Sequence, residues 1–291
     1  MGIKITYYLL LLPLSILPFK VLYALSDLLY YILYRIIRYR KSIVYKNLKN
    51  SFPNKDEKEL NQIMSSFYRH LCDIMMENTK TFAISKNQLT KRMNIKNPEL
   101  VNQYAKKGES VIIVGSHFNN WELFAQSTPL HCSHECLAIY KPLRNKFFNL
   151  KLKNARERFG LKMIPMRKTI KYFKSSKNPR AIFFASDQSS SNPKNVYWMN
   201  FLNQETGVLF GVEKLSKYYN WPVFIYKINK IKRGCYEAEY ELLTNSPKEM
   251  QHGAITETFT NIIEEQIINQ PQYWLWSHKR WKHQRPNKSN I

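Results

Sequence analysis

The longest apolar stretch of the chain stands at its start. Residues 5–19 (ITYYLLLLPLSILPF) carry no charged side chain, Lys20 follows, and residues 21–34 (VLYALSDLLYYILY) contain only Asp27. A helix of residues 5–19 would extend about 22 Å, which is less than the roughly 30 Å of a bilayer's hydrocarbon core. We therefore expect an N-terminal hydrophobic membrane-anchoring helix, either as one tilted span over 5–34 or as a bent helix in the interface.

Two other interpretations of this segment stay open. A cleavable signal peptide requires small residues at a cleavage site, and Ala24-Leu25-Ser26 is a poor candidate because apolar residues continue past it. The second alternative is a buried helix of a soluble domain.

Basic residues follow the apolar stretch directly. Six of them stand in one run without an acid: Arg35, Arg38, Arg40, Lys41, Lys46 and Lys49. Such a run is attracted to an anionic cytoplasmic leaflet and places the rest of the chain in the cytoplasm. A solvated basic helix face is the alternative, but it leaves the apolar stretch unexplained. We expect residues 1–50 to form the anchor and its basic flank, and residues 51–291 to form one further domain.

The remaining pattern alternates between helical and strand periods. Apolar residues recur every three or four positions over 55–80, which predicts an amphipathic helix. Further helices are expected near 145–159, 206–219 and 254–269, and strands at 111–114, 137–140, 163–166, 181–186, 196–202, 223–231 and 236–243. This alternation predicts an α/β fold with a largely parallel sheet flanked by helices.

The charge balance indicates an anionic partner. The chain has 45 Lys and Arg against 21 Asp and Glu, a net charge of +24. Nucleic acid, an anionic bilayer and acidic carrier proteins all fit such an excess, and a genome biased toward Lys and Asn codons would also produce part of it. No nucleic-acid-binding module is recognisable, so we do not expect nucleic acid as the partner.

The cysteines do not suggest a disulfide framework or a metal site. Cys72, Cys132, Cys136 and Cys235 are few for a chain of this length, which is typical of a reducing compartment. The cluster 131–136 (HCSHEC) lacks a second pair of ligands elsewhere, so we interpret it as core thiols and surface histidines.

One candidate for chemistry stands at the end of a predicted strand, in the stretch VIIVGSHFNNWELFA (111–125). Ligands gather at the carboxyl ends of strands in such sheets. Glu122 begins the next helix and could fold back to His117, which would make a general-base dyad. No Gly-x-Ser-x-Gly nucleophile elbow is present. The pair therefore suits direct attack by a substrate hydroxyl on an activated acyl group, whereas a purely structural histidine is the alternative.

The residues around this pair resemble a motif of a known family. HFNNWE is similar to the HFGNWE box of the bacterial lipid A biosynthesis acyltransferases, which are relatives of the glycerolipid acyltransferases with a His-x4-Asp box. Further similarities run along nearly the whole chain, in NLKNSFPNKDEKE (47–59), YKPLRNKFFNLKLKNARERFG (140–160), Asp187-Gln188, Phe201-Leu202, Thr206-Gly207 and YWLWSHKRWK (273–282).

The resemblance implies an enzyme at the cytoplasmic face of the bacterial inner membrane, among inner membrane lipids. It would move a fatty acyl chain from an acyl carrier protein or CoA thioester to a hydroxyl of a lipid A precursor, an anionic phosphoglycolipid, without a cofactor. His117 would be the base and Glu122 would orient it. Backbone amides or a cation would stabilise the oxyanion.

The resemblance also implies substrate-binding residues, which are Arg158, Arg156, Asn120, Trp121, Lys141 and Asp187. Residues 141–180 contain fourteen Lys and Arg and a single acid. Within this segment we expect Arg158 first, and Arg156 second, to contact the acceptor phosphate or the oxyanion, because guanidinium binds phosphate in a bidentate manner. Part of this surface would dock acyl carrier protein, and the rest is solvated helix face. Asp187 supports the site or caps a helix.

Three positions depart from the family's pattern. Asn119 replaces the glycine of the box and is the best substitute if this position needs a positive φ. Asn203 stands where glycine is usual, which leaves the acyl chain length open, and Lys141 replaces an arginine. Near the C-terminus, 278–280 would meet lipid headgroups, or Trp276 and Trp281 would pack at the bilayer interface.

Two other functions stay possible on the sequence. The same chemistry could act on a lysophospholipid, an aminolipid or a phosphoinositide mannoside, because the motifs do not choose the acceptor. A non-catalytic basic membrane-binding protein is the second, and the intact His117 and Glu122 argue against it.

Overall fold

A computed structural model describes residues 2–174, 178–190 and 193–286 of the protein. Its centre is a seven-stranded sheet in the order β1-β9-β8-β2-β5-β3-β4, beside a two-stranded β6-β7 sheet. The strands are β1 (Met93–Ile95), β2 (Val111–Gly115), β3 (Glu135–Tyr140), β4 (Lys162–Pro165), β5 (Arg180–Ala185), β6 (Val196–Phe201), β7 (Gln204–Leu209), β8 (Val223–Lys232) and β9 (Cys235–Thr244). Within the large sheet, β8 and β9 form the antiparallel pair and the other neighbours are parallel. This confirms the predicted α/β fold.

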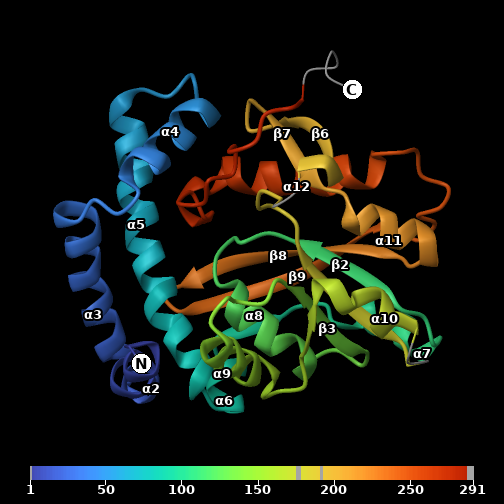
Figure 1. Ribbon diagram of the computed structural model, residues 1–291, viewed down its shortest axis with the longest axis horizontal. Coiled ribbons are helices and arrows are strands. Elements are labelled where there is room, and N and C mark those ends of the chain that lie inside the picture. The colour runs from blue at the N-terminus through green and yellow to red at the C-terminus, as the bar shows by residue number, and fades with distance from the viewer. Residues whose placement is uncertain (1, 175–177, 191–192, 287–291) are drawn as a thin grey trace.

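The helices cover both faces of the large sheet (Figure 1). In chain order they are α1 (Gly2–Thr6), α2 (Leu12–Ile16), α3 (Phe19–Tyr30), α4 (Lys41–Ser51), α5 (Glu57–Thr79), α6 (Lys86–Thr90), α7 (Glu99–Lys106), α8 (Trp121–Ser127), α9 (Lys146–Glu157), α10 (Thr169–Lys174), α11 (Gly211–Tyr219) and α12 (Ala254–Asn269). The predicted long amphipathic helix is α5, which begins with a capping box. The Glu59 amide donates to Asp56 Oδ1 (2.8 Å) and the Asp56 amide donates to Glu59 Oε2 (3.0 Å).

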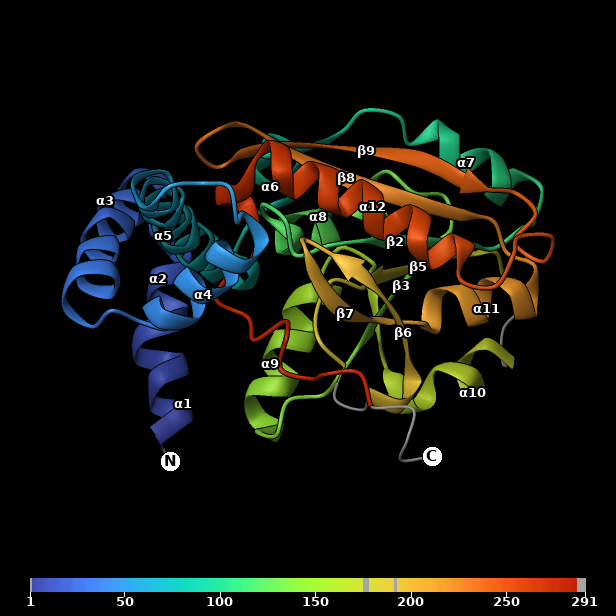
Figure 2. The same cartoon turned by 90° about the horizontal axis from the view of Figure 1, so that it is seen from above.

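The central strand β2 is buried at all five residues because both of its faces are covered. Ile112 and Val114 belong to a core shared with α5 and α12. Val111 and Ile113 belong to a second core shared with α7 and α8. Figure 2 shows α11 and α12 on one side of the sheet, together with the β6-β7 hairpin. The cores therefore hold the end of β2 rigidly between two layers.

The apolar N-terminal segment forms two helical stretches that meet at Pro18. The first runs through α1, the π-helical Tyr7–Leu11 and α2, and the second joins α3 to the π-helical Tyr31–Ile36. In Figure 1 these stretches lie outside α5, and α3 packs directly on it. No helix in the described part of the chain combines the length and the apolar character that crossing a membrane requires.

The β6-β7 hairpin corrects the prediction of a helix over 206–219. Residues 204–209 are a strand, and the helix begins only at Gly211. Leu202 (φ +50°) and Asn203 (φ +59°) form the two-residue connection. Positive φ at both central residues is the requirement of the tight hairpin turns, and asparagine tolerates it well. This explains how Asn203 takes the usual glycine's place.

Candidate active site

His117 lies two residues beyond the end of β2, in the short loop that leads into α8. Strand β2 can end beside β8 only because Gly115 has no side chain, since a Cβ there would lie 2.3 Å from the Tyr226 ring. β5 is the parallel neighbour of β2 and ends at Ala185. Residues that follow the two strands therefore meet at one edge of the sheet, and this brings Asp187 to His117.

Asp187 is the carboxylate that holds His117. The Nδ1 atom of His117 lies 2.7 Å from Asp187 Oδ1, and the His117 backbone amide donates to Asp187 Oδ2 (3.0 Å). The indole of Trp274 also donates to Oδ2 (2.9 Å). With an ionised Asp187, Nδ1 carries the proton and Nε2 is left as the basic nitrogen. Nε2 makes no hydrogen bond with any residue in the described ranges, and the imidazole lines an open cavity.

The two groups perturb each other's pKa values. Burial disfavours the imidazolium, but the charge and hydrogen bond of Asp187 raise the pKa of His117 above its ordinary value. Burial disfavours the carboxylate as well, yet His117 and the Trp274 indole lower the pKa of Asp187 to about 2. Asp187 is therefore ionised at any physiological pH, and His117 is a stronger base than a free imidazole.

Glu122 does not occupy the place expected for it. Its carboxylate pairs with Arg156 in a bidentate manner, with Nε of Arg156 at 2.8 Å from Oε2 and Nη2 on Oε1. The expected contact of Glu122 with the His117 ring is wrong, because Asp187 already occupies Nδ1. The reason is geometric: Glu122 lies in the first turn of α8 and faces α9, whereas Asp187 comes from the neighbouring strand.

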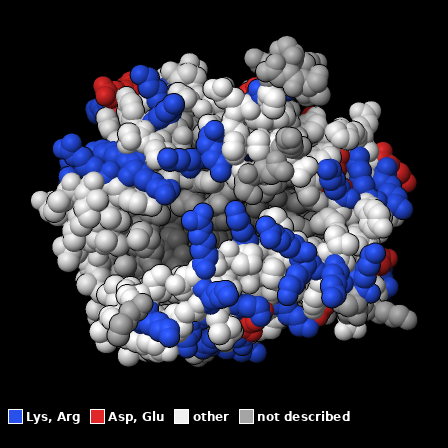
Figure 3. Space-filling model, in the orientation of Figure 1, with Lys and Arg blue, Asp and Glu red and all other residues white. Residues whose placement is uncertain are grey.

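A cavity of about 440 Å³ lies in front of His117, a size usual for small-molecule sites. Its basic lining residues are Lys141, Arg156 and Lys282, and its apolar ones include Phe124, Leu161, Met163, Phe183 and Tyr226. A second cavity, of about 560 Å³, lies between the N-terminal helices, α5 and the C-terminal segment, and Trp121 and Gln188 line both. Figure 3 shows the hollow on this face, with Lys and Arg side chains gathered around it.

The other predicted site residues divide into those at the cavity and those away from it. Trp121 stands beside the imidazole with ring centroids 5.0 Å apart, and Lys141 and Arg156 line the cavity as well. Arg158, the preferred anion ligand, is directed to the Thr81 carbonyl (3.4 Å) and is not a lining residue of this cavity.

Asn120 is also not in contact with the cavity. It is fully buried, its Oδ1 accepts from the Leu123 amide as the N-cap of α8, and its Nδ2 donates to Glu77. Asn119 has a φ of +52°, so the expected positive φ at the position of the box glycine is confirmed.

The C-terminal segment packs into the protein beside the site and forms part of the walls of both cavities. Trp276 is fully buried, so its placement at a bilayer interface is wrong. Arg280 is buried too and donates to the Gly207 carbonyl (3.0 Å), which removes it as a headgroup contact. His278 Nε2 accepts from the Ser189 amide (3.3 Å).

The sequence indicated that Asp187 supports the site, but not that it rather than Glu122 contacts His117, nor that Trp274 and Glu77 take part. The bond between Asp187 and Trp274 joins parts of the chain 87 residues apart, and no local spacing predicts it. Two signals pointed to Asp187 itself: it follows a strand, as His117 does, and it stands in the Asp187-Gln188 element of the resemblance. Glu77 carried no signal at all, because a single acid on an amphipathic helix normally faces solvent.

Comparisons with known proteins show the family of the chain. The family model of the bacterial lipid A biosynthesis acyltransferases matches residues 2–283. The chain is similar to the lipid A biosynthesis palmitoleoyltransferase of Escherichia coli K12, with 21% identity over 94% of this chain and 89% of that one. It is also similar to the lauroyltransferase of the same organism (20% identity; 91% and 87% covered) and to a lipid A biosynthesis acyltransferase of Haemophilus influenzae (23%; 84% and 78%). The chain is therefore an O-acyltransferase and belongs to the bacterial lipid A biosynthesis acyltransferase family.

Proposed function

We propose that this enzyme transfers a fatty acyl group from a thioester to a hydroxyl of a lipid A precursor, with His117 as the general base. One observation carries the proposal: Asp187 holds Nδ1 of His117, and the imidazole lines a cavity that has both basic and apolar lining residues. The names of the similar proteins support the acceptor class.

The reaction needs no nucleophile from the protein. Nε2 of His117 takes the proton of the acceptor hydroxyl while the oxygen attacks the thioester carbonyl carbon. The C–O bond forms, the tetrahedral intermediate collapses, and the C–S bond breaks. The imidazolium then returns the proton to the leaving thiolate. Asp187 fixes the tautomer throughout and stabilises the positive charge that His117 carries between the two steps.

The cavity lining suits both substrates. Arg156 is held in place by Glu122 and, with Lys141 and Lys282, provides cations for phosphate groups of the acceptor or for the oxyanion. The apolar residues between α8 and the sheet provide an apolar surface against which the acyl chain would pack. Glu122 therefore acts on the reaction by orienting Arg156.

The surface of the molecule offers regions that would bind the acyl donor and the membrane. Acyl carrier proteins are acidic, and the Lys and Arg side chains around the hollow in Figure 3 form a complementary surface. CoA is the other possible thioester carrier. Residues 3–39 expose thirteen large apolar side chains, which are suited to lie in the interface of the bacterial inner membrane from its cytoplasmic side.

The test is acyl transfer from labelled acyl carrier protein thioesters by membranes that contain this chain. The acceptors are a tetra-acylated lipid A precursor and, in parallel, lysophosphatidate. We expect label in the lipid A precursor, and we expect His117→Ala to abolish it. His252→Ala, which changes an exposed histidine before α12, is the matched control and keeps full activity. Transfer to lysophosphatidate alone would overturn the acceptor, and equal rates for His117→Ala and wild type would overturn the base.

A further inference from the structure

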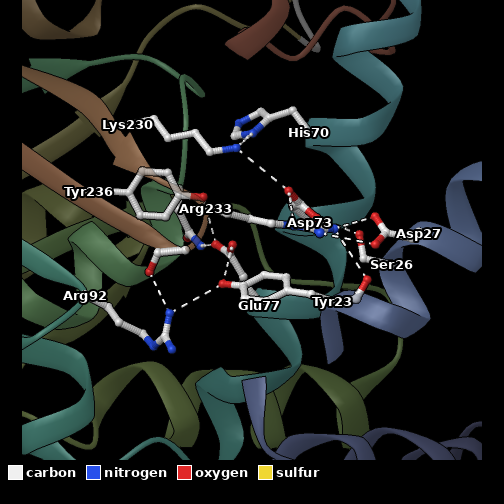
Figure 4. Close-up of polar contacts among 12 residues, drawn as sticks. Tyr23, Ser26, Asp27, His70, Asp73, Glu77, Arg92, Lys230, Arg233 and Tyr236 are labelled. Carbon is white, nitrogen blue, oxygen red and sulfur yellow. Dashed lines mark hydrogen bonds and ion pairs between the residues drawn. The ribbon is translucent and has the colours of Figure 1, made fainter. Parts of the chain in front are cut away.

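A buried carboxylate lies behind the site, on the helix that separates it from the N-terminal stretches. Glu77 belongs to α5 and has no exposed surface. Figure 4 shows it at the centre of a group of polar side chains from α3, α5 and the β8-β9 hairpin. Its Oε1 accepts from the Tyr23 hydroxyl (3.2 Å), and its Oε2 accepts from Tyr236 (2.9 Å) and from Asn120 Nδ2 (2.7 Å). All three donors come from different parts of the chain.

The bond to Asn120 reaches the loop that carries His117. Asn120 is fully buried and uses its Oδ1 to cap α8, so Nδ2 is its remaining group, and Glu77 accepts from it. The same loop is held at Asn119, whose Nδ2 donates to the Ile228 carbonyl (2.7 Å) and whose amide donates to the Tyr273 carbonyl (3.0 Å). Two ionisable side chains thus hold this loop by hydrogen bonds in the described part of the chain: Asp187 at His117, and Glu77 at Asn120.

We propose that Glu77 is a positioning residue that keeps His117 in line with Asp187 by holding Asn120. The inference rests on the proposed role of His117 as the base. Glu77 is not a lining residue of the His117 cavity, and its hydrogen bond to Asn120 is its link to the loop. Because Tyr23 lies on α3, the same carboxylate also connects this loop to the apolar N-terminal stretches.

The role is geometric and does not need a charge on Glu77. Burial raises the pKa of Glu77 above its ordinary value, while the hydrogen bonds from Asn120 and Tyr236 oppose this shift. A glutamine has the same shape. Its amide oxygen can accept from Asn120 and Tyr236, and its nitrogen can donate to the Tyr23 hydroxyl. Glu77→Gln should therefore preserve what Glu77→Leu removes.

Asp73 offers a matched control on the same face of α5, one turn earlier. It is buried as well, and it binds Ser26 of α3 (2.7 Å) and Arg233 (2.6 Å). Among the described residues, its hydrogen bonds and ion pairs do not include any member of the 117–120 loop. Asp73→Leu thus makes the same kind of change without touching the loop.

The experiment measures two quantities on the full chain in detergent. The first is the titration of the His117 ring by NMR of the ¹⁵N-histidine-labelled protein, assigned with His117→Gln, which needs no substrate. The second is kcat and KM for acyl transfer. The variants are Glu77→Leu, Glu77→Gln, Asp73→Leu and Asn120→Ser. A serine keeps an oxygen to cap α8 but is too short to reach Glu77, so this variant remains informative if Glu77→Leu does not fold.

For Glu77→Leu and Asn120→Ser we expect the His117 titration to move to lower pH and kcat to fall about 10-fold or more, with KM within about twofold of wild type. Glu77→Gln and Asp73→Leu should match wild type in both quantities. Unchanged titration in Asn120→Ser, an equal effect of Asp73→Leu, or failure of Glu77→Gln to preserve the titration would overturn the proposal. A wild-type protein without transfer activity but with these titrations would contradict the proposed function and leave the positioning role supported.

Discussion

At the scale of single residues, the choice between two carboxylates decides how His117 is held. Asp187 binds both the ring and the backbone amide of His117, whereas Glu122 binds Arg156. A carboxylate with two bonds to one residue fixes the plane of the ring as well as its tautomer. The two acids thus have separate partners: Asp187 holds the imidazole, and Glu122 holds a cation of the cavity.

The pH dependence of the reaction should follow His117. A general base works only when it has lost its proton, so kcat/KM should rise with pH and level off. Because Asp187 raises the pKa of His117, the half-maximal rate should lie above pH 6.5. His278 does not add to this limb, since burial lowers its pKa to about 4. Initial rates between pH 5 and 9, with recovery at pH 8 as the stability control, check this. A rate that is flat across the range would refute it.

Glu122→Gln should change substrate binding more than it changes the base. The variant loses the ion pair that holds Arg156 in the cavity, so we expect kcat/KM for the acceptor to fall about 10-fold. The pH at half-maximal rate should stay close to that of wild type, because the Asp187 contacts are intact. Steady-state kinetics at several pH values measure both. A shift in the pH at half-maximal rate in this variant would show that Glu122 is the partner of His117.

The site residues show which features could be predicted from the sequence and which could not. His117 and its place after a buried strand are predictable, because a strand end is a local pattern. The contact with Asp187, 70 residues later, depends on β5 lying next to β2. The order of strands in a sheet cannot be predicted from local periodicity. The prediction ranked Arg158 above Arg156, but Arg156 is the one that lines the cavity. The two arginines belong to one motif, and only the packing of α9 decides which side chain enters the cavity.

At the scale of elements, periodic segments were predicted well and the segments defined by turns were not. The helix expected over 254–269 is α12, with the same bounds. The β7 strand was read as the start of a helix, because the turn before it is made by Leu202 and Asn203 and carries no glycine. β1, with three residues, was too short to give a pattern.

The attachment of α3 to α5 should depend on Arg233. This side chain bridges the buried Asp73 and the exposed Asp27 of α3. Arg233→Met leaves Asp73 without its closest cation, so we expect the free energy of unfolding to fall by about 1–3 kcal/mol. Thermal denaturation followed by intrinsic fluorescence measures this. The control is Arg285→Met, which breaks an exposed pair with Glu205 and should cost about 0.5 kcal/mol or less. Equal effects of the two substitutions would contradict the prediction.

The exposed apolar face of the N-terminal stretches should govern membrane binding. Leu9 and Ile16 are 75% and 71% exposed, so replacing both with asparagine should not disturb the fold. Removing two apolar side chains from an interface should weaken partition to anionic phospholipid vesicles roughly 100-fold. Vesicle flotation measures it, and Tyr218→Asn, at a residue 73% exposed on α11, is the control. Unchanged flotation of the double variant would remove the N-terminus from the membrane contact.

At the scale of the whole molecule, the apolar N-terminus, the basic rim and the site lie on connected surfaces. The cavity between α5 and the N-terminal helices shares Trp121 and Gln188 with the cavity of His117. In the proposed function, a lipid held at the bilayer interface would reach His117 through these two cavities, and an acidic carrier would dock on the Lys and Arg side chains around the hollow of Figure 3. This arrangement would give the excess of positive charge a role that the composition alone left open.

The rate of acyl transfer to the lipid A precursor by Asp187→Asn, beside wild type and His117→Ala, decides whether Asp187 and His117 act together. An asparagine keeps the size of the side chain but removes the charge that fixes the His117 tautomer. We expect the Asp187→Asn rate to fall about 100-fold or more, close to that of His117→Ala. An Asp187→Asn rate near wild type, with the protein folded, would contradict the central claim that Asp187 and His117 act as the catalytic pair.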